Sequence, residues 1–404
     1  MLSWVSPFRQ GISGSFARVA DWKNLNRLAR AININKMRHL GIAEIAKLAN
    51  VTIGTVDRAL HGRKGIREST RRKILEIARS VGYRPNLAAR ALSVRRDPIR
   101  IGICIPREIH NYFDQLYQGI NAEAQRAELL GIEAIWRRTE RFGKVESEKV
   151  SELIDMEPSA LILALGSSQG LTQVIDEAES RGIRVICVDT DLPASKRSTA
   201  VCVDAEASGH VAAELLGNMV LPGGRVAVIT GMMHIEDHRR KTESFCDAYP
   251  KFCQGGVVVE VIEAHEDDDE GFQKSFTAFE QHKSIAGVYI NTANCLPVCR
   301  AIWAKGMAGR VRLITTDLFA EMRPYFEKGT ISASISSRPY LQGERAMRVA
   351  VDYVLNGTPL PKFHFIAPQL AMRSTFHLFP EMRVAQDRKS ATQSPELDAA
   401  RILP

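Results

Sequence analysis

The sequence has no apolar run long enough to cross a membrane. Its uninterrupted hydrophobic stretches all fall short of the roughly 18 residues that a membrane span needs. Residues 1–36 also lack a hydrophobic signal-peptide core followed by a small-residue cleavage site. We therefore expect a globular protein of the cytoplasm, with no membrane partner.

Cysteine is scarce, and no two cysteines form the C-x-x-C pair that holds zinc or exchanges disulfides. Because the number of cysteines is odd and no pairing motif is present, we expect them to be small, apolar, buried side chains in a reducing compartment. The seven cysteines are Cys104, Cys187, Cys202, Cys246, Cys253, Cys295 and Cys299.

Nucleotide-binding and catalytic motifs are missing as well. There is no G-x-G-x-x-G or G-K-[ST] sequence to hold a nucleotide phosphate, and no nucleophile can be matched with a base. We therefore expect no cofactor and no enzymatic activity. The rival hypothesis is an enzyme built on α/β lobes. Turnover of a sugar by the purified protein would support it.

Positive charge is concentrated in one short segment. The chain has 404 residues with 45% hydrophobic content, which predicts two or three domains, and its net charge is +8. Residues 37–100 carry 15 Lys and Arg against 5 Asp and Glu, a net charge of +10, so the remainder is slightly acidic. This segment is either a head that binds a polyanion such as DNA or a basic, solubilising surface.

A helical pattern fills residues 42–61 and predicts two short helices joined by a tight turn. Asn50 stands at the turn, where it tolerates a positive φ, and the Thr52 hydroxyl caps the second helix. A third helix over about residues 69–81 packs on both and ends at Gly82. The residues that recur at helical spacing in the first two helices are Ile45, Leu48, Val51, Val56 and Leu60, and those of the third are Ile74, Ile77, Ala78 and Val81.

Three such helices predict a helix-turn-helix, in which the N-terminal residues of the second helix face base edges in the major groove. Arg58 alone can place two hydrogen bonds on a guanine, and Ile53 can contact a thymine methyl. The residues at this position are Thr52, Ile53, Gly54, Thr55 and Arg58. The residues suited to phosphate contact are Thr55, Arg67, Thr70 and Arg71.

This stretch resembles the head of the lactose-repressor (LacI/GalR) family. The resemblance rests on Ala46 in the first helix, on V-T-I-G-T-V-D-R over residues 51–58, and on Y-R-P-N over residues 83–86. It departs at Ile53 and Gly54, where family members often carry residues that hydrogen-bond bases. The resemblance implies Met37 as the natural start, a head over 37–84, and an N-terminal extension over 1–36 that is disordered or a mis-assigned leader.

The resemblance also implies a hinge over residues 85–99, which folds when two copies meet on DNA. Leu92 occupies the position of a leucine that is pushed into the minor groove. Asn86, Ala89 and Arg90 would then lie along the groove. The alternative for Leu92 is packing on the domain that follows.

From residue 100, β-rich runs alternate with amphipathic helical stretches, which predicts parallel sheets covered by helices on both faces. A second set of units starts at GGRVAVITG, so we expect two similar lobes with a cleft between them. This α/β architecture resembles the type I periplasmic sugar-binding proteins over residues 100–375, followed by a tail over 376–404. The expected strands are IRIGICIP, ALILAL, RVICVDT, RVAVIT, VVVEVIE, GVYINT and RLITTD.

Ligands of such sheets bind at the carboxyl ends of the strands, so polar residues after strand ends are the candidates. Carboxylates there suit a sugar or polyol better than a purine. For Asp189, Arg239 and Asp317 the alternative is a salt bridge that stabilises one lobe. The candidates are Asn111, Tyr112, Phe113, Asp189, Arg239, Asn291, Asn294 and Asp317.

Two further patches contain potential metal ligands. His234 and His238 lie one helical turn apart in HIEDH, but no third metal ligand is evident, so we assign no metal site. The acidic run over residues 263–272 is expected to be a solvated loop rather than a cation site.

These features predict a DNA-binding transcription regulator controlled by a small sugar or polyol, most simply a repressor. It would act as a homodimer or tetramer on a pseudo-palindromic operator in double-stranded DNA. The alternatives are an activator or corepressor-dependent regulator of the same family, and a solute-binding protein that carries a basic tail.

Overall fold

The computed structural model describes residues 41–60, 65–81, 99–142, 145–166, 170–380 and 382. The chain divides into two compact units, Met1–Asn86 and Leu87–Pro404, and each is described by itself. No helix within these described ranges is apolar over enough length to span a bilayer. All seven cysteines are free thiols, and six of them are buried as predicted; Cys246 is partly exposed.

The described part of the first unit is a head of three helices: α2 (Ile42–Ala49), α3 (Ile53–Leu60) and α4 (Glu68–Ser80). Ile45, Val56 and Ile74 come from one helix each, are fully buried and form the centre of its core. Leu48 shares their spacing but is 40% exposed. The head therefore closes around a small apolar core that the helical spacing largely predicts.

The turn between α2 and α3 confirms the prediction made from its local sequence. Asn50 has a φ of 57°, in the left-handed region. The Thr52 hydroxyl accepts a hydrogen bond from the Thr55 backbone N–H at 3.2 Å, which satisfies one of the free donors at the start of α3.

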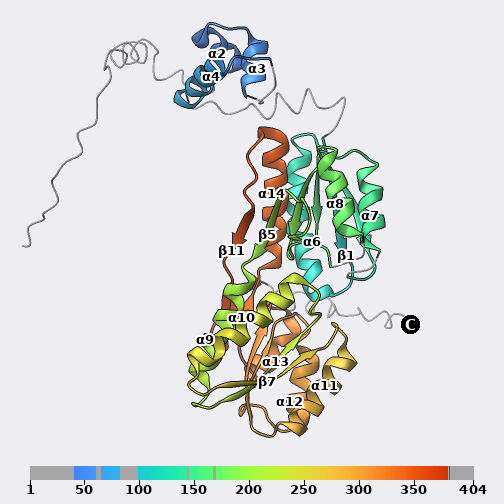
Figure 1. The fold of residues 1–404 in the computed structure, drawn as a ribbon, viewed down its shortest axis with the longest axis vertical. Coiled ribbons are helices and arrows are strands. Elements are labelled where there is room, and N and C mark those ends of the chain that lie inside the picture. The colour runs from blue at the N-terminus through green and yellow to red at the C-terminus, as the bar shows by residue number, and fades with distance from the viewer. Residues whose placement is uncertain are drawn as a thin grey trace, which may run out of the picture. The chain divides into compact units, whose positions relative to one another are not determined.

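Lobe 1 of the second unit has a six-stranded parallel sheet in the order β11-β5-β4-β3-β1-β2. Helices α6 (His110–Glu128) and α14 (Pro339–Asn356) pack together on one face, and α7 (Glu146–Ile154) and α8 (Leu171–Ser180) cover the other (Figure 1). The strands are β1 (Ile99–Pro106), β2 (Ile132–Thr139), β3 (Ala160–Leu163), β4 (Arg184–Val188), β5 (Thr199–Val203) and β11 (Phe363–Ile366).

Lobe 2 repeats this plan in the order β12-β10-β9-β8-β6-β7, with β12 antiparallel to β10. Helices α9 (Ala205–Met219) and α10 (Glu236–Phe252) cover one face. Helices α11 (Asp268–Gln281), α12 (Leu296–Ala304) and α13 (Arg323–Glu327) cover the other. The strands are β6 (Arg225–Thr230), β7 (Val257–Glu263), β8 (Ile285–Ile290), β9 (Arg312–Thr316), β10 (Ile331–Ser336) and β12 (Gln369–Met372).

The chain passes between the lobes three times: from β5 to α9, from β10 to α14, and from β11 to β12. The prediction of two similar α/β lobes is thus confirmed, and the second lobe already begins at α9, before GGRVAVITG. Because the strands within each sheet run parallel apart from β12, their carboxyl ends gather at one edge, and these two edges supply residues to the pocket between the lobes.

Five strands that were not predicted from the sequence belong to the sheets: β2, β5, β10, β11 and β12. Four of them lack the apolar run by which the other strands were predicted, because they lie at a sheet edge or contain serine. In β10 (ISASIS) the buried Ser334 hydroxyl donates a hydrogen bond of 2.5 Å to the Asp317 carbonyl, so its polar group is satisfied inside the sheet.

Candidate functional site

The exposed surface of α3 and its N-terminal cap carries most of the residues predicted to read bases. Thr52, Ile53, Gly54 and Arg58 are exposed, with Ile53 57% exposed, whereas Thr55 is partly buried. A Cβ on Gly54 would lie 3.9 Å from Arg58 Nη2, so the guanidinium lies beside Gly54. The apolar Ile53 and the forked Arg58 donors are therefore both available to an outside partner.

Of the four residues predicted to contact phosphate, Thr55 lies in α3 and the other three lie at the start of α4. Arg67 is exposed immediately before this helix, and Thr70 and Arg71 are partly buried within its first turn. Arg71 Nε is 3.7 Å from Glu68 Oε2. The hinge residues Asn86, Ala89, Arg90 and Leu92 lie outside the described residues.

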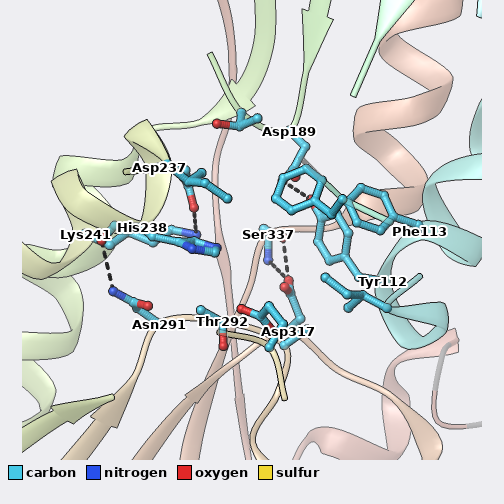
Figure 2. A pocket seen from close by; sticks show the side chains of 16 residues that line it. Tyr112, Phe113, Asp189, Asp237, His238, Lys241, Asn291, Thr292, Asp317 and Ser337 are labelled. Atoms are coloured by element: carbon cyan, nitrogen blue, oxygen red, sulfur yellow. Dashed lines mark hydrogen bonds and ion pairs between the residues drawn. The ribbon is translucent and has the colours of Figure 1, made fainter. Parts of the chain in front are cut away.

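A second candidate site is the pocket between the two lobes (Figure 2). Its lobe 1 side is aromatic. Tyr112 and Phe113 meet edge to face with ring centroids 5.1 Å apart, and Phe113 packs on Phe142 at 5.4 Å. The Tyr112 hydroxyl donates a hydrogen bond to Asp189, which directly follows β4. This wall offers ring faces beside one oriented carboxylate.

Asp189 and Asp317 follow strands β4 and β9 and both have a positive φ, 74° and 63°. Asp317 accepts hydrogen bonds from the Ser337 backbone N–H at 2.8 Å and from the Ser337 hydroxyl at 2.5 Å. Burial raises the pKa of Asp317, although the Lys241 ammonium and the Ser337 donors oppose it. Burial, reinforced by the nearby Asp237 carboxylate, raises the pKa of Asp189 to about 7.

A hydrogen-bond chain links the two strand-end aspartates across the lobes. Gln342 Nε2, on α14, donates to the Ser337 carbonyl at 2.8 Å and to the Tyr112 hydroxyl at 3.3 Å. These hydrogen bonds therefore connect Asp317 to Asp189 through Ser337, Gln342 and Tyr112. It follows one of the segments that pass between the lobes.

Helix α10 forms the opposite wall with Asp237, His238 and Lys241 (Figure 2). The Lys241 ammonium lies 2.5 Å from the Asp237 carboxylate, and both side chains are nearly buried. Burial alone would lower the pKa of Lys241, but the Asp237 carboxylate, together with Tyr289 and Asp317, outweighs it and raises the pKa above its usual value. Gly209 on α9 makes this placement possible, since a Cβ there would lie 2.5 Å from the Lys241 carbonyl.

His238 is a neutral donor in this wall. Its Nδ1 accepts a hydrogen bond from the Met232 backbone N–H at 3.1 Å. Burial lowers the pKa of His238 to about 4, so the ring carries its single proton on Nε2 at neutral pH.

Asn291 follows β8 and is fully buried. Its Nδ2 donates to the Thr242 hydroxyl at 2.8 Å and to the His238 carbonyl at 3.1 Å, which holds α10 against the sheet. Its Oδ1 has no hydrogen-bond partner in the described part of the chain. Asn291 thus positions one wall and leaves one acceptor unused.

The expectation of a solvated loop over residues 263–272 is wrong in two respects. Asp267 caps α11, which begins at Asp268, by accepting from the Glu270 backbone N–H at 2.8 Å. Glu266 lines the pocket, and both of its carboxylate oxygens are buried. Burial raises the pKa of Glu266 to about 7, although the nearby Thr292 hydroxyl lowers it.

Five of the eight predicted effector residues line this pocket: Tyr112, Phe113, Asp189, Asn291 and Asp317. The other three lie elsewhere. The Asn111 carbonyl accepts from Gln115 on its own helix. Asn294 leaves its buried Nδ2 without a partner in the described residues. Arg239 pairs with Glu236 and Glu243, each at 2.7 Å, along a different face of α10 from Asp237 and Lys241.

Asp237, His238, Lys241, Glu266 and Ser337 are pocket residues that were not predicted from the sequence. Ser337 directly follows β10, and Glu266 follows β7 by three positions, so the rule of polar residues after strand ends would have found both. The i, i+4 spacing of Asp237 and Lys241 was a signal for the ion pair.

Each of the two units contains a region that matches a known family model. Residues 41–86 match the family model of bacterial regulatory proteins of the lacI family, and residues 101–358, more than half of the chain, match that of the periplasmic binding protein domain. The chain belongs to the periplasmic binding protein domain family and carries a lacI-type regulatory region at residues 41–86. The LacI-type match covers the three described helices of the head, and the second match covers most of both lobes.

Among curated relatives of this chain, catabolite control protein A of Streptococcus mutans is 38% identical over 80 residues. That match covers 20% of this chain and 24% of the relative, so the chain spans about a quarter of that protein. The HTH-type transcriptional regulator DegA of Bacillus subtilis is 24% identical over 272 residues, which are 66% of this chain and 77% of DegA.

A solved structure has the same two-lobed fold. It is a solute-binding protein of an ABC transporter from Burkholderia graminis, in complex with D-arabinose. The match has a TM-score of 0.64 at 21% identity and covers 70% of this chain and 97% of that one. At this identity the likeness concerns the fold of the lobes.

Proposed function

We propose that this protein is a DNA-binding transcription regulator, most simply a repressor, whose affinity for its operator is set by a small sugar or polyol bound between the lobes. The observation that carries the proposal is the exposed surface of α3, which begins at the Thr52 cap and presents Ile53 and Arg58, in a region that matches the lacI family model.

The head would read DNA through a few side chains. Arg58 donates two hydrogen bonds to a guanine, Ile53 contacts a thymine methyl, and Arg67 with Thr70 and Arg71 holds phosphates. A second copy would place its own head one helical turn away on a pseudo-palindromic site. The hinge over residues 85–99, with Leu92 as a minor-groove wedge, would report the spacing of the two heads.

The pocket would bind the effector without chemical conversion. Ring faces from Tyr112 and Phe113 suit the apolar face of a sugar, and Asp189 and Asp317 accept hydrogen bonds from its hydroxyls. The D-arabinose complex of a protein with the same fold supports this ligand class. Because lobe 1 and lobe 2 each supply one of the aspartates, ligand binding would favour one angle between the lobes and shift the population that binds DNA.

The test is selection of genomic DNA sites by the full chain, followed by titration of the enriched site with two variants. Arg58→Ala should weaken binding to that site by about 1 to 3 kcal/mol and leave binding to random DNA nearly unchanged. Arg79→Ala removes the same charge from an exposed position late in α4 and should affect both DNAs alike. Failure to enrich any site at low ionic strength would refute the proposal and favour a solute-binding protein located in the cytoplasm.

A further inference from the structure

The pocket between the lobes holds more negative charge than its own cation neutralises. Four carboxylates line it: Asp189, Asp237, Glu266 and Asp317. Lys241 is the one ammonium among the described lining residues, and it is already paired with Asp237 at 2.5 Å. The buried His238 ring is neutral and adds no positive charge. Three carboxyl groups of this described lining therefore have no ammonium paired with them, and a cationic ligand would favour their ionised form.

Glu266 is the most unusual of the three. Both of its carboxylate oxygens are buried, neither meets hydrogen-bond geometry with a partner in the described part of the chain, and the Thr292 hydroxyl is the one nearby donor that lowers its pKa. The backbone fixes this arrangement, since His265 and Glu266 have φ values of 48° and 56°. A Cβ on Gly231 would come within 2.2 Å of Glu266 Oε1 and 2.7 Å of His238 Cε1, so only glycine leaves room for both side chains.

A second buried acceptor of this pocket also lacks a partner among the residues that the structure describes. Asn291 is fully buried and its Oδ1 is unpaired within the described residues, while its Nδ2 is fully used. Buried polar atoms are costly unless they find a partner, so a ligand rich in donors is expected here. An ammonium group offers three donors and no acceptor, whereas each sugar hydroxyl offers one donor.

We infer that the effector is a polyhydroxylated molecule that carries a positively charged amine, an amino sugar or an amino polyol, with the ammonium placed against the Glu266 carboxyl group. This inference rests on the proposed effector role of the pocket and narrows its ligand class. A hydroxylated body is expected in addition to the amine, because Tyr112 and Phe113 offer ring faces to a sugar, and Asp189 and Asp317 can accept hydrogen bonds from its hydroxyls. A sugar acid or sugar phosphate would add negative charge to this pocket and is excluded.

The test compares matched pairs that differ only in the amine. Calorimetry with the full chain uses D-glucosamine against D-glucose, D-galactosamine against D-galactose, and tris(hydroxymethyl)aminomethane against pentaerythritol, with N-acetylglucosamine as an uncharged derivative. A charge-assisted hydrogen bond to a buried carboxylate predicts tenfold to hundredfold tighter binding of the amine in at least one pair. Equal response within every pair, including no response to either member, overturns the inference.

Two variants locate the amine. Glu266→Gln keeps the shape of the side chain, so it should reduce the amine preference at least tenfold while leaving the thermal unfolding midpoint unreduced. Asp269→Asn removes a charge from an exposed position of the same acidic run and should leave the preference intact. An amine preference that survives Glu266→Gln unchanged would overturn the placement.

The outcome is separable from the proposed function. A neutral sugar that releases operator DNA while every amine fails would overturn the inference and leave the regulator in place. Loss of all site-specific DNA binding would instead contradict the regulator itself.

Discussion

The buried ion pair between Asp237 and Lys241 offers the sharpest test of how α10 builds the effector pocket. The side chains are 13% and 8% exposed and the ammonium lies 2.5 Å from the carboxylate. Replacing Lys241 with methionine keeps the length of the aliphatic chain but leaves the Asp237 carboxylate buried beside Asp189 and Asp317. Breaking a buried pair in this way costs about 3 to 5 kcal/mol.

Adding Asp237→Asn to Lys241→Met removes the unpaired charge, so the double variant should regain about 2 kcal/mol or more of that loss. The measurement is thermal unfolding of the full chain followed by circular dichroism, in which the single variant should melt roughly 6 °C or more below the parent. As a control, Arg240→Met, which removes an arginine from a partly exposed pair with Glu206 at 3.3 Å, should change the midpoint little. If the unfolding midpoint of Lys241→Met equals or exceeds that of the double variant, the buried Asp237 carboxylate does not need Lys241 for its stability, and the ion pair does not hold this wall of the pocket.

Two further predictions concern pH and the head. Because burial raises the pKa of Glu266 from 4.5 to about 7, the folded chain holds a proton there that the unfolded chain has lost, so stability from this group falls as pH rises from about 4.5 through 7. Thermal unfolding of Glu266→Gln should therefore show a flatter decline over this range, with a difference of about 3 kcal/mol at most, and parallel pH curves for variant and parent would contradict the assignment. Thr52→Ala should destabilise the start of α3 by about 1 kcal/mol while Thr52→Ser retains the cap, as measured by hydrogen exchange of the Thr55 amide; equal exchange in both variants would remove the cap from the account.

The parts of the molecule that the sequence predicted well are those governed by neighbours in the chain. Asn50 and Thr52 act on residues within five positions, so the turn and cap of the head could be inferred directly. Asp189 and Asp317 were found because the carboxyl ends of parallel strands meet at one edge of a sheet. Each of these inferences needed only a local rule and the fold class.

The parts that escaped depend on tertiary position. Glu266 and Asp269 belong to one acidic run, and only the packing around Gly231 buries the first and leaves the second exposed. Arg239 and Lys241 are both basic residues of α10, and the rotation of that helix decides which one faces the pocket. In the serine-rich strand β10, a tertiary hydrogen bond to the Asp317 carbonyl satisfies the buried Ser334 hydroxyl, a feature that an apolar pattern does not reveal.

Thermodynamic coupling between the pocket and the head is the central claim, and linkage gives it a direct test. Operator affinity is measured by fluorescence anisotropy with and without a saturating pocket ligand, and ligand affinity is measured by calorimetry with and without operator. We predict that both affinities change by one common factor, about fivefold or more, as reciprocity requires. A ligand that binds the pocket with the same affinity on and off DNA, and leaves operator affinity unchanged, would contradict the account.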